Sequence, residues 1–419
     1  MKTTPVKGTN DYTPIEAEVR DYLQDQILAV YRKYGFERIV TPIIEDSENL
    51  DKSEGGDNLN LVFKIMKRGD KLQAALNSGQ FDQLADMGLR YDLTLPLCRY
   101  VANNQSKLIY PFKVIQMGSV YRAERPQRGR LREFTQCDID VIGSASPNIE
   151  IELLHVASEA LIAIGLKAFT VKVNDRRVLK SMLLGFGFAE ADLDSVSISF
   201  DKLDKIGVSG VTNELIEKGF SSIAVDAFRA NLDQGGYPLD ELIDHIDDKV
   251  VGKNLKYIID ESSRIAQETM RNFKDVNYRV VFDPSLVRGQ GYYTGTVFEI
   301  ASDEFKGAIA GGGRYDNLIG KFIHTDVPAV GISIGFERIF SILMASGFQI
   351  PNQKRRIVMF YEPNDFPEAF KKAESLRDTY TINLLERPKK IGPYLEKLKG
   401  KNITGFINFG VSDDISEFN

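Results

Sequence analysis

The chain has 419 residues, of which 43% are hydrophobic and 27% charged, a balance typical of a folded protein with more than one domain. Its net charge of −6 excludes a general nucleic-acid coat, because such proteins are usually basic, although a local basic patch remains compatible with it. Two cysteines and three scattered histidines form neither a disulfide framework nor a zinc motif. We therefore expect no metal held by protein ligands and a cytoplasmic location.

The first predicted element is a helix that begins near residue 14. Thr13, Pro14 and Glu16 have the spacing of a capping box with proline at the first helical position, and apolar residues follow at helical intervals. The β-branched run at residues 38–44 then predicts a strand.

The middle of the chain predicts strands and helices around a helical insertion. Residues 112–143 predict two strands joined by a turn, and further strands are expected at residues 169–173, 278–282, 294–300 and 329–334. Helices are expected at residues 148–164, 175–184 and 335–346, and the pattern is mostly helical from 190 to 277. Charged residues interrupt the longest apolar stretch, residues 151–169, so no membrane span is expected.

The C-terminal part predicts a separate small domain. GFQIPNQK at residues 347–354 has the composition of a linker. Beyond it the pattern alternates β-α-β-α-β and stops after the third strand, which predicts a small α/β domain at residues 355–419.

Arginines gather in one segment, residues 119–132, with a single carboxylate, Glu124. The arginines of this segment are Arg122, Arg125, Arg128, Arg130 and Arg132. Taken alone, such a segment fits a solvated hairpin tip. In the strand that follows, however, alternation places Phe134, Gln136, Asp138 and Asp140 on the same face as Arg132. A face this polar lies in water or lines a polar site, and a ligand with both a phosphate and an ammonium group suits its charges.

Three further blocks carry arginine beside glycine or tyrosine. They are Arg288 with Tyr292 and Tyr293 in residues 286–300, Arg314 with Tyr315 in a predicted Gly-rich turn at 308–320, and Arg338 in residues 329–339. Each block alone also fits a loop arginine paired with an acid, or tyrosines of the core. Arg338 falls in the first turn of a predicted helix, where cations are disfavoured, so an anionic ligand would explain it. The sequence has no GxxxxGK[ST] loop, which makes arginines the natural ligands for a phosphate.

Together these blocks resemble the motifs of class II aminoacyl-tRNA synthetases and, within that class, of the histidyl-tRNA synthetases. ERIVTPIIED, GSVYRAERPQRGRLREF and GISIGFERI are similar to the first, second and third motifs of the class. LVRGQGYYTGTVFE and AGGGRYD are similar to stretches particular to the histidine enzymes, and KGTNDYTP, LRYDLTLPL and VNDRR also match. The resemblance spans about residues 5 to 345, with the motifs in family order.

The resemblance implies an α+β fold. Its catalytic domain is expected at residues 1–190 and 278–346, on an antiparallel sheet flanked by helices, with a mostly helical insertion at 191–277. The domain at 355–419 resembles the family's anticodon-binding domain but is shorter, as if truncated. The implied activity is ATP-dependent activation of L-histidine to histidyl-adenylate, with release of pyrophosphate, and transfer to tRNA(His). The family uses Mg²⁺ with ATP and works as a homodimer.

The resemblance also implies roles for individual residues. The implied ATP-binding residues are Arg122, Glu124, Arg130 and Arg338. The implied histidine-binding residues are Asp92, Thr94, Gln136, Asp140, Arg288, Tyr292, Tyr293 and Tyr315. Arg122 and Arg288 are expected to act in catalysis. Arg288 would perform a catalytic role that a metal ion performs in other members of the class. The expected tRNA contacts are Arg125, Arg128 and Arg130.

Two departures from the family pattern stand out. Asp92 and Asp140 replace the Glu of many bacterial relatives, which matches a branch that includes eukaryotic enzymes. The short C-terminal domain leaves an alternative open, a synthetase-like regulatory subunit of ATP phosphoribosyltransferase that transfers nothing to tRNA. Retained Arg122, Arg288 and Arg338 favour the enzyme. A generic nucleotide-binding module would explain these arginines but not the set of residues that suits an imidazole.

Overall fold

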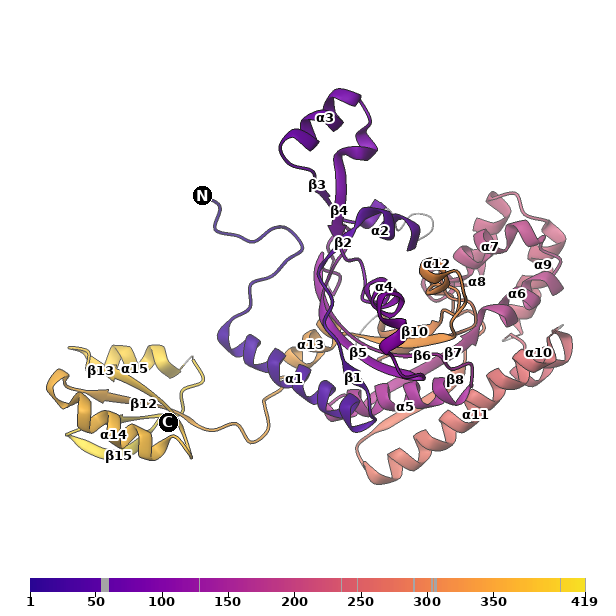
Figure 1. The fold of residues 1–419 in the computed structure, drawn as a ribbon. Coiled ribbons are helices and arrows are strands. Elements are labelled where there is room, and N and C mark those ends of the chain that lie inside the picture. The colour runs from indigo at the N-terminus through magenta and orange to yellow at the C-terminus, as the bar shows by residue number, and fades with distance from the viewer. Residues whose placement is uncertain are drawn as a thin grey trace. The chain divides into compact units, whose positions relative to one another are not determined.

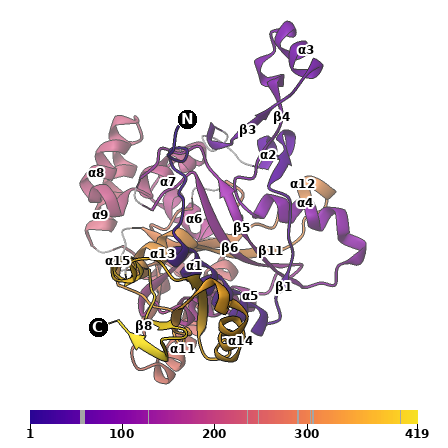
Figure 2. The ribbon, with the colours of Figure 1, turned by 90° about the vertical axis from the view of Figure 1, so that its left-hand side faces the viewer.

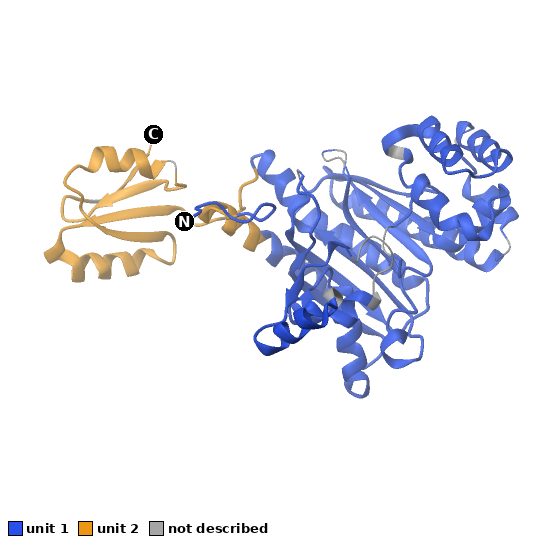
Figure 3. Cartoon of the chain, turned by 90° about the horizontal axis from the view of Figure 1, so that it is seen from above, with its two compact units in different colours: residues 1–10, 23–347 blue, residues 11–22, 348–419 orange. Residues whose placement is uncertain are grey.

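The computed structural model describes residues 1–53, 60–127, 129–234, 236–246, 248–288, 291–302, 304, 307–399 and 401–418. They form two compact units, one of residues 1–10 and 23–347 and one of residues 11–22 and 348–419 (Figure 3). None of the helices in these described ranges combines the length and the apolar character that crossing a bilayer requires.

The larger unit is built on an eight-stranded sheet in the order β1-β5-β6-β11-β10-β9-β7-β8 (Figure 1). The strands are β1 (Glu37–Arg38), β5 (Phe112–Tyr121), β6 (Glu133–Ile142), β7 (Ala168–Asp175), β8 (Asn277–Phe282), β9 (Thr296–Ala301), β10 (Ala308–Arg314) and β11 (Ala329–Gly335). The central pairs are antiparallel, and the outermost pair at each edge, β1 with β5 and β7 with β8, is parallel. The antiparallel-based α+β fold that the motifs imply is therefore confirmed.

Helices cover both faces of this sheet. Figure 1 shows α5 (Asn148–Ala163) and α11 (Lys249–Asn272) on one side and α4 (Thr94–Asn104) and α12 (Gly320–Ile323) on the other. The alternation of β6 explains this arrangement, because its apolar residues, such as Ile139 and Val141, are fully buried while its polar residues occupy the opposite face. The polar face is the one that later forms the site.

The strand expected at residues 38–44 is broken in two. β1 ends at Arg38, and the chain then leaves the large sheet and pairs again as β2 (Ile44–Asp46) in a three-stranded sheet, β2-β4-β3. Pro42 lies between the two pieces, and its missing N–H cannot support a continuous ladder. β3 (Lys64–Met66) and β4 (Ala85–Leu89) complete this small sheet, and α3 (Asp70–Ser78), which joins them, lies at its outer end (Figure 2).

The Gly-rich turn expected at residues 308–320 is wrong over its first half, which is strand β10. A Cβ atom at Gly312 would lie 2.0 Å from the carbonyl oxygen of Gly331 on β11. A Cβ atom at Gly313 would lie 2.7 Å from the carbonyl oxygen of Thr296 on β9. These glycines therefore allow close approach between neighbouring strands.

The stretch between β7 and β8 is helical, as its pattern predicts. It holds α6 (Arg176–Gly185), α7 (Leu193–Phe200), α8 (Leu203–Glu217), α9 (Ser222–Asp233), α10 (Leu239–His245) and α11. Aromatic side chains form its core, with Phe200 and Phe228 fully buried and their ring centroids 4.9 Å apart.

The smaller unit contains the expected β-α-β-α-β pattern and one strand more. Its elements are β12 (Arg356–Tyr361), α14 (Phe366–Leu376), β13 (Thr381–Glu386), α15 (Ile391–Lys399), β14 (Gly405–Asn408) and β15 (Ser412–Glu417). The expectation that the domain stops after its third strand is wrong, because β15 pairs antiparallel with β14. The sequence pattern did not predict β15, because its serine and acidic residues are uncommon in strands.

The sequence correctly predicts the start of the first helix and the linker after the last helix of the larger unit. The N–H of Thr13 donates to Oε2 of Glu16 at 2.7 Å and the N–H of Glu16 donates to Oγ1 of Thr13 at 3.3 Å, so the capping box before α1 (Pro14–Lys33) is confirmed. The linker expected at 347–354 has no regular structure and follows α13 (Phe336–Ala345).

Candidate active site

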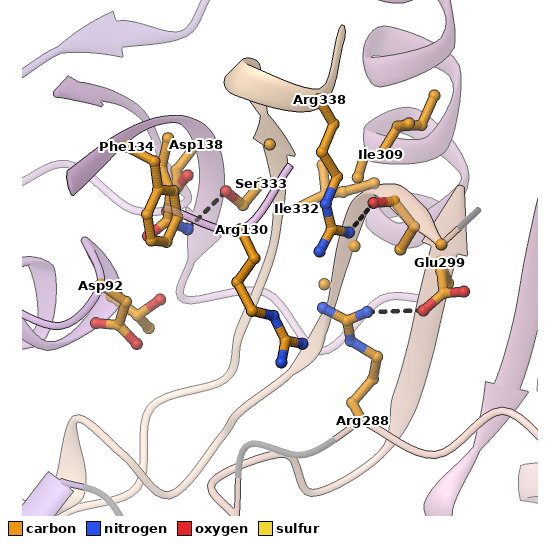
Figure 4. Close-up of a pocket in the computed structure, with 18 of the residues that line it drawn as sticks. Asp92, Arg130, Phe134, Asp138, Arg288, Glu299, Ile309, Ile332, Ser333 and Arg338 are labelled. Carbon is orange, nitrogen blue, oxygen red and sulfur yellow. Dashed lines mark hydrogen bonds and ion pairs between the residues drawn. The ribbon is translucent and has the colours of Figure 1, made fainter. Parts of the chain in front are cut away.

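A cavity of about 1090 Å³ lies on the polar face of the large sheet and is lined by β6, β9, β10, β11 and the segments that join them (Figure 4). The predicted ATP- and histidine-binding residues all line it: Arg122, Glu124, Arg130, Arg338, Asp92, Thr94, Gln136, Asp140, Arg288, Tyr292, Tyr293 and Tyr315. Of the arginines predicted to contact tRNA, Arg125 is exposed and does not line the cavity, and Arg128 lies outside the described residues.

The floor of the cavity is the polar face of β6. Phe134, Gln136, Asp138 and Asp140 line the cavity, as the alternation predicts. β6 is paired on both sides, with β5 and β11, so these side chains are held on a rigid strand inside the sheet. Arg132, expected on the same face, does not line the cavity; its Nε donates to the carbonyl oxygen of Glu124 at 3.2 Å instead.

One end of the cavity is cationic. Nη1 of Arg338 donates to the carbonyl oxygen of Ala308, and Nη1 of Arg288 pairs with Oε2 of Glu299 at 3.0 Å. Nε of Arg130 pairs with Oε2 of Glu124 at 2.9 Å. Figure 4 shows the guanidinium groups of Arg130, Arg288 and Arg338 converging on one space. An anion with several oxygen atoms suits this end.

Positive charge is crowded around Arg338. Burial lowers the pKa of its guanidinium, and the neighbouring charges of Arg130 and Arg288 lower it further. These guanidinium groups repel one another, so an anion bound among them would relieve the repulsion. Arg338 also lies in the first turn of α13, where the helix dipole is positive, as the sequence predicts.

Arg122 lies over two aromatic rings. Its Cζ is 4.1 Å from the ring centroid of Tyr91 and 5.1 Å from that of Phe134, and its Nε donates to the carbonyl oxygen of Tyr91 at 3.2 Å. Stacking on these rings fixes the plane of the guanidinium. Tyr91 was missed by sequence reasoning, although it directly precedes Asp92 in the LRYDLTLPL stretch.

The other end of the cavity is acidic. Oδ2 of Asp92 accepts a hydrogen bond from the hydroxyl of Tyr292 at 3.3 Å, and Oδ1 of Asp140 accepts one from the hydroxyl of Tyr315 at 2.6 Å. Burial raises the pKa of Asp140 to about 7, and it also raises the pKa of Asp92. Carboxylates held this way favour a bound cation or N–H donors, which stabilise their charged form.

Three tyrosines wall this acidic end. The ring centroids of Tyr292 and Tyr293 are 4.8 Å apart, and those of Tyr292 and Tyr315 are 6.0 Å apart. Burial raises the pKa of Tyr293 to about 12, against an opposing effect of Arg288, so its hydroxyl keeps its proton at neutral pH. The space between these rings and the carboxylates suits a small flat ring that carries N–H groups.

Several residues of the cavity were missed by sequence reasoning, and one of the arginine blocks has a structural role. Asp138, Ser333, Glu299, Lys172 and Asp283 line the cavity but were assigned no role. The register of β6 was the only signal for Asp138. Arg314, by contrast, is a buried partner of Glu150, with Nε–Oε1 and Nη2–Oε2 distances of 2.7 and 2.8 Å.

The antiparallel sheet, with arginines at one end of its cavity and carboxylates at the other, agrees with the class II aminoacyl-tRNA synthetase architecture that the motifs imply. A family model described as "Histidyl-tRNA synthetase" matches residues 8–339. A histidine–tRNA ligase from Leifsonia xyli is 41% identical over 371 residues, which cover 86% of this chain and 84% of the relative. The chain belongs to the histidyl-tRNA synthetase family.

Solved structures share the fold. The crystal structure of histidyl-tRNA synthetase from Nostoc sp. PCC 7120 is 26% identical with a TM-score of 0.76, covering 97% of this chain and 91% of the other. A structure from Bacillus halodurans titled as an ATP phosphoribosyltransferase regulatory subunit/histidyl-tRNA synthetase is 20% identical with a TM-score of 0.75, covering 97% of each chain. At that identity the second likeness bears on the fold alone.

Proposed function

We propose that the protein is a histidine–tRNA ligase that activates L-histidine with ATP and transfers the histidyl group to tRNA(His). The observation that carries this proposal is the shared cavity, in which a cluster of guanidinium groups lies beside a carboxylate and tyrosine notch. The family membership supports it, because relatives with this sequence pattern carry the name of the enzyme.

ATP occupies the cationic end in this proposal. Arg338 and Arg130 take the triphosphate, and Arg122, held flat by its aromatic neighbours, takes the α-phosphate. Mg²⁺ is expected to arrive with ATP, where it would neutralise phosphate charge. Glu124 and Glu299 offer the oxygen ligands that Mg²⁺ prefers, but each is paired with an arginine, so they suit a metal that comes with the triphosphate.

Histidine occupies the acidic end. The imidazole has two ring nitrogens, and Asp140 and the hydroxyl of Tyr293 read one each, with Tyr315 holding Asp140 in place. Asp92, Thr94 and Gln136 face the α-ammonium group. A wrong side chain would leave these buried partners unpaired, which can discriminate by about 10⁴-fold.

The reaction needs no protein nucleophile. The histidine carboxylate oxygen attacks the α-phosphorus of ATP, a new P–O bond forms, and pyrophosphate leaves with the electrons of the broken bond. Charge spreads over the phosphate oxygens in the transition state, so Arg122 and Arg288 act by fixed electrostatic stabilisation. A terminal ribose hydroxyl of tRNA then attacks the histidyl carbonyl carbon, and AMP leaves.

The Arg-rich segment leads to a prediction about salt. If Arg125 and its neighbours contact tRNA phosphates, the kcat/KM of aminoacylation should fall more steeply with salt than that of adenylate formation. Arg125→Ala should flatten the salt dependence of aminoacylation by about one unit of log–log slope and leave adenylate formation unchanged. If kcat/KM falls equally steeply with salt for both reactions of the wild type, the Arg-rich segment does not contact tRNA.

The family also works as a homodimer, and we extend that assembly to this chain. Val40 and Ile43, between β1 and β2, and Ile44, the first residue of β2, are 82%, 41% and 50% exposed. Exposed apolar side chains clustered on one segment favour burial in an interface with a second copy. Sedimentation equilibrium should give twice the mass of the chain.

The buried free cysteines, Cys98 and Cys137, suit a reducing compartment, so we place the reaction in the cytoplasm.

The regulatory-subunit alternative is not favoured. It rests on the short C-terminal domain and on a structure that is 20% identical, whereas the histidine–tRNA ligase from Leifsonia xyli is 41% identical. The decisive assay is histidine-dependent exchange of labelled pyrophosphate into ATP by the purified protein. The enzyme predicts exchange that requires L-histidine. A folded protein that binds histidine but gives no exchange would favour the regulatory subunit.

A further inference from the structure

Arg314 and Tyr315 are neighbours in the chain, but only Tyr315 lines the cavity. β10 ends at Arg314, so Tyr315 is the first residue beyond the strand. Tyr315 is 2% exposed, and its hydroxyl donates to Oδ1 of Asp140 at 2.6 Å. The contacts at this strand end therefore decide whether the Tyr315 hydroxyl reaches the carboxylate.

The side chain of Arg314 is anchored to a helix on the opposite face of the sheet. Its Nε and Nη2 donate to the two carboxylate oxygens of Glu150 in α5, at 2.7 and 2.8 Å. These two side chains are only 8% and 2% exposed. Figure 1 shows α5 across the sheet from α4, whose first residue, Thr94, lines the cavity. Two parallel hydrogen bonds fix both the position and the plane of the guanidinium.

Asp316, the next residue after Tyr315, completes the network. Its Oδ1 accepts from Nη1 of Arg314 at 3.2 Å and from the N–H of Ala329, the first residue of β11, at 3.0 Å. The N–H of Asp316 donates to Oγ1 of Thr294 at 3.1 Å, and the N–H of Tyr315 donates to the carbonyl oxygen of Ala329 at 2.8 Å. Both chain neighbours of Tyr315 are thus tied to other elements, α5 and β11.

Stability alone is a weak explanation for the buried pair of Arg314 and Glu150. Moving two charges out of water costs free energy that their attraction offsets only in part, and apolar residues of similar volume often stabilise a core as well. Burial lowers the pKa of Arg314, but the hydrogen bonds and charges of Glu150 and Asp316 outweigh that effect and raise the pKa overall. The guanidinium stays charged, and its directional bonds give the strand end a fixed orientation.

We infer that Glu150, Arg314 and Asp316 are positioning residues for histidine recognition, because they hold the Tyr315 hydroxyl against Asp140. None of these three residues lines the cavity, so they act through Tyr315 and not on the substrate. The inference rests on the proposed function, since it takes Asp140 as a partner of the imidazole. It extends the histidine site to a helix on the far face of the sheet.

Loss of the Tyr315 hydrogen bond would change the charge of Asp140. Burial raises the pKa of Asp140 to about 7, the hydrogen bond from Tyr315 opposes this rise, and the negative charge of Asp92 adds to it. Without the hydrogen bond, Asp140 would be protonated more of the time at neutral pH. A neutral carboxyl accepts a hydrogen bond from an imidazole N–H more weakly than a carboxylate does, so the affinity for histidine should fall.

A double-mutant cycle in the full-length protein separates this role from a purely structural one. Arg314→Lys keeps the positive charge but loses the bidentate geometry, and Tyr315→Phe removes the hydroxyl alone. The KM values for histidine and for ATP are measured by pyrophosphate exchange on the wild type, both single variants and the double variant, with thermal unfolding as a check on folding. If Arg314→Lys does not fold, Asp316→Ala takes its place, because the side chain of Asp316 is 33% exposed and the buried pair is left intact.

Tyr315→Phe should raise the KM for histidine by about 10-fold, the loss of a hydrogen bond to a charged group, and leave the KM for ATP unchanged. Arg314→Lys should have a similar effect by itself and little effect in the Tyr315→Phe background, because both changes remove the same hydrogen bond. Effects that multiply in the double variant, a rise in both KM values, or wild-type KM values in either single variant would overturn the inference. A folded wild type without histidine-dependent exchange would instead count against the proposed function itself.

Discussion

Arg288→Ala is expected to slow histidyl-adenylate formation by about 10²-fold or more, roughly the loss of one fixed donor in the transition state. Glu299 holds the guanidinium at 3.0 Å, and the backbone of Gly311 makes room for it, since a Cβ atom there would lie 2.6 Å from Cζ of Arg288. The side chain is therefore oriented before the substrates bind. Its buried Nε has no hydrogen-bond partner in the described residues.

Single-turnover formation of the adenylate, followed by quenched flow with labelled ATP, measures this step directly. Arg279→Ala is the matched control, because Arg279 is exposed on the edge strand β8 and does not line the cavity. The control should retain the wild-type rate. Near-normal adenylate formation by Arg288→Ala would show that this arginine has no catalytic role.

The second large effect is expected at Asp140. Asp140→Asn should raise the KM for histidine by about 10-fold or more, the loss of a charged hydrogen-bond acceptor, and should leave the KM for ATP nearly unchanged. Asp140 is packed tightly against the neighbouring strand, since a Cβ atom at Gly331 would lie 1.8 Å from its Oδ1. The asparagine oxygen can still accept the Tyr315 hydroxyl, so the variant should keep its shape.

The Asp140→Asn variant is expected to remain folded, so a change in its KM values reports on substrate binding. Burial raises the pKa of Asp140 to about 7, so at neutral pH the folded state disfavours its charged form relative to the unfolded chain, and a neutral side chain removes that cost. Asp194→Asn is the matched control, because Asp194 is exposed in the first turn of α7. An equal rise in the KM values for histidine and ATP would argue against contact with the imidazole.

The sequence was most informative where one pattern decides local structure. The alternation in β6 predicted which of its residues line the cavity, and the alternating pattern of the C-terminal part predicted two helices there, which are α14 and α15. The motifs predicted the arginines and carboxylates of the site, and the structure brings those residues into one cavity. Their individual roles stay predictions until they are tested.

Features that depend on long-range packing could not be predicted. The glycines of β10 serve the approach of β11 and β9, which no local pattern reveals. The same holds for Arg314, whose partner Glu150 lies in α5, and for Tyr91 under Arg122. The position of Asp138 opposite Ser333 depends on the register of β6 and β11, which only the paired strands define.

The central claim is that one cavity holds the nucleotide and the amino acid in contact. A crystal structure of the protein with 5′-O-[N-(L-histidyl)sulfamoyl]adenosine, a stable analogue of the adenylate, tests it most directly. We predict the sulfamoyl group against Arg122 and Arg288, the adenosine toward Arg338, and the imidazole between Asp140 and Tyr293. An analogue bound elsewhere, or bound here with its imidazole turned away from Asp140, would contradict the account.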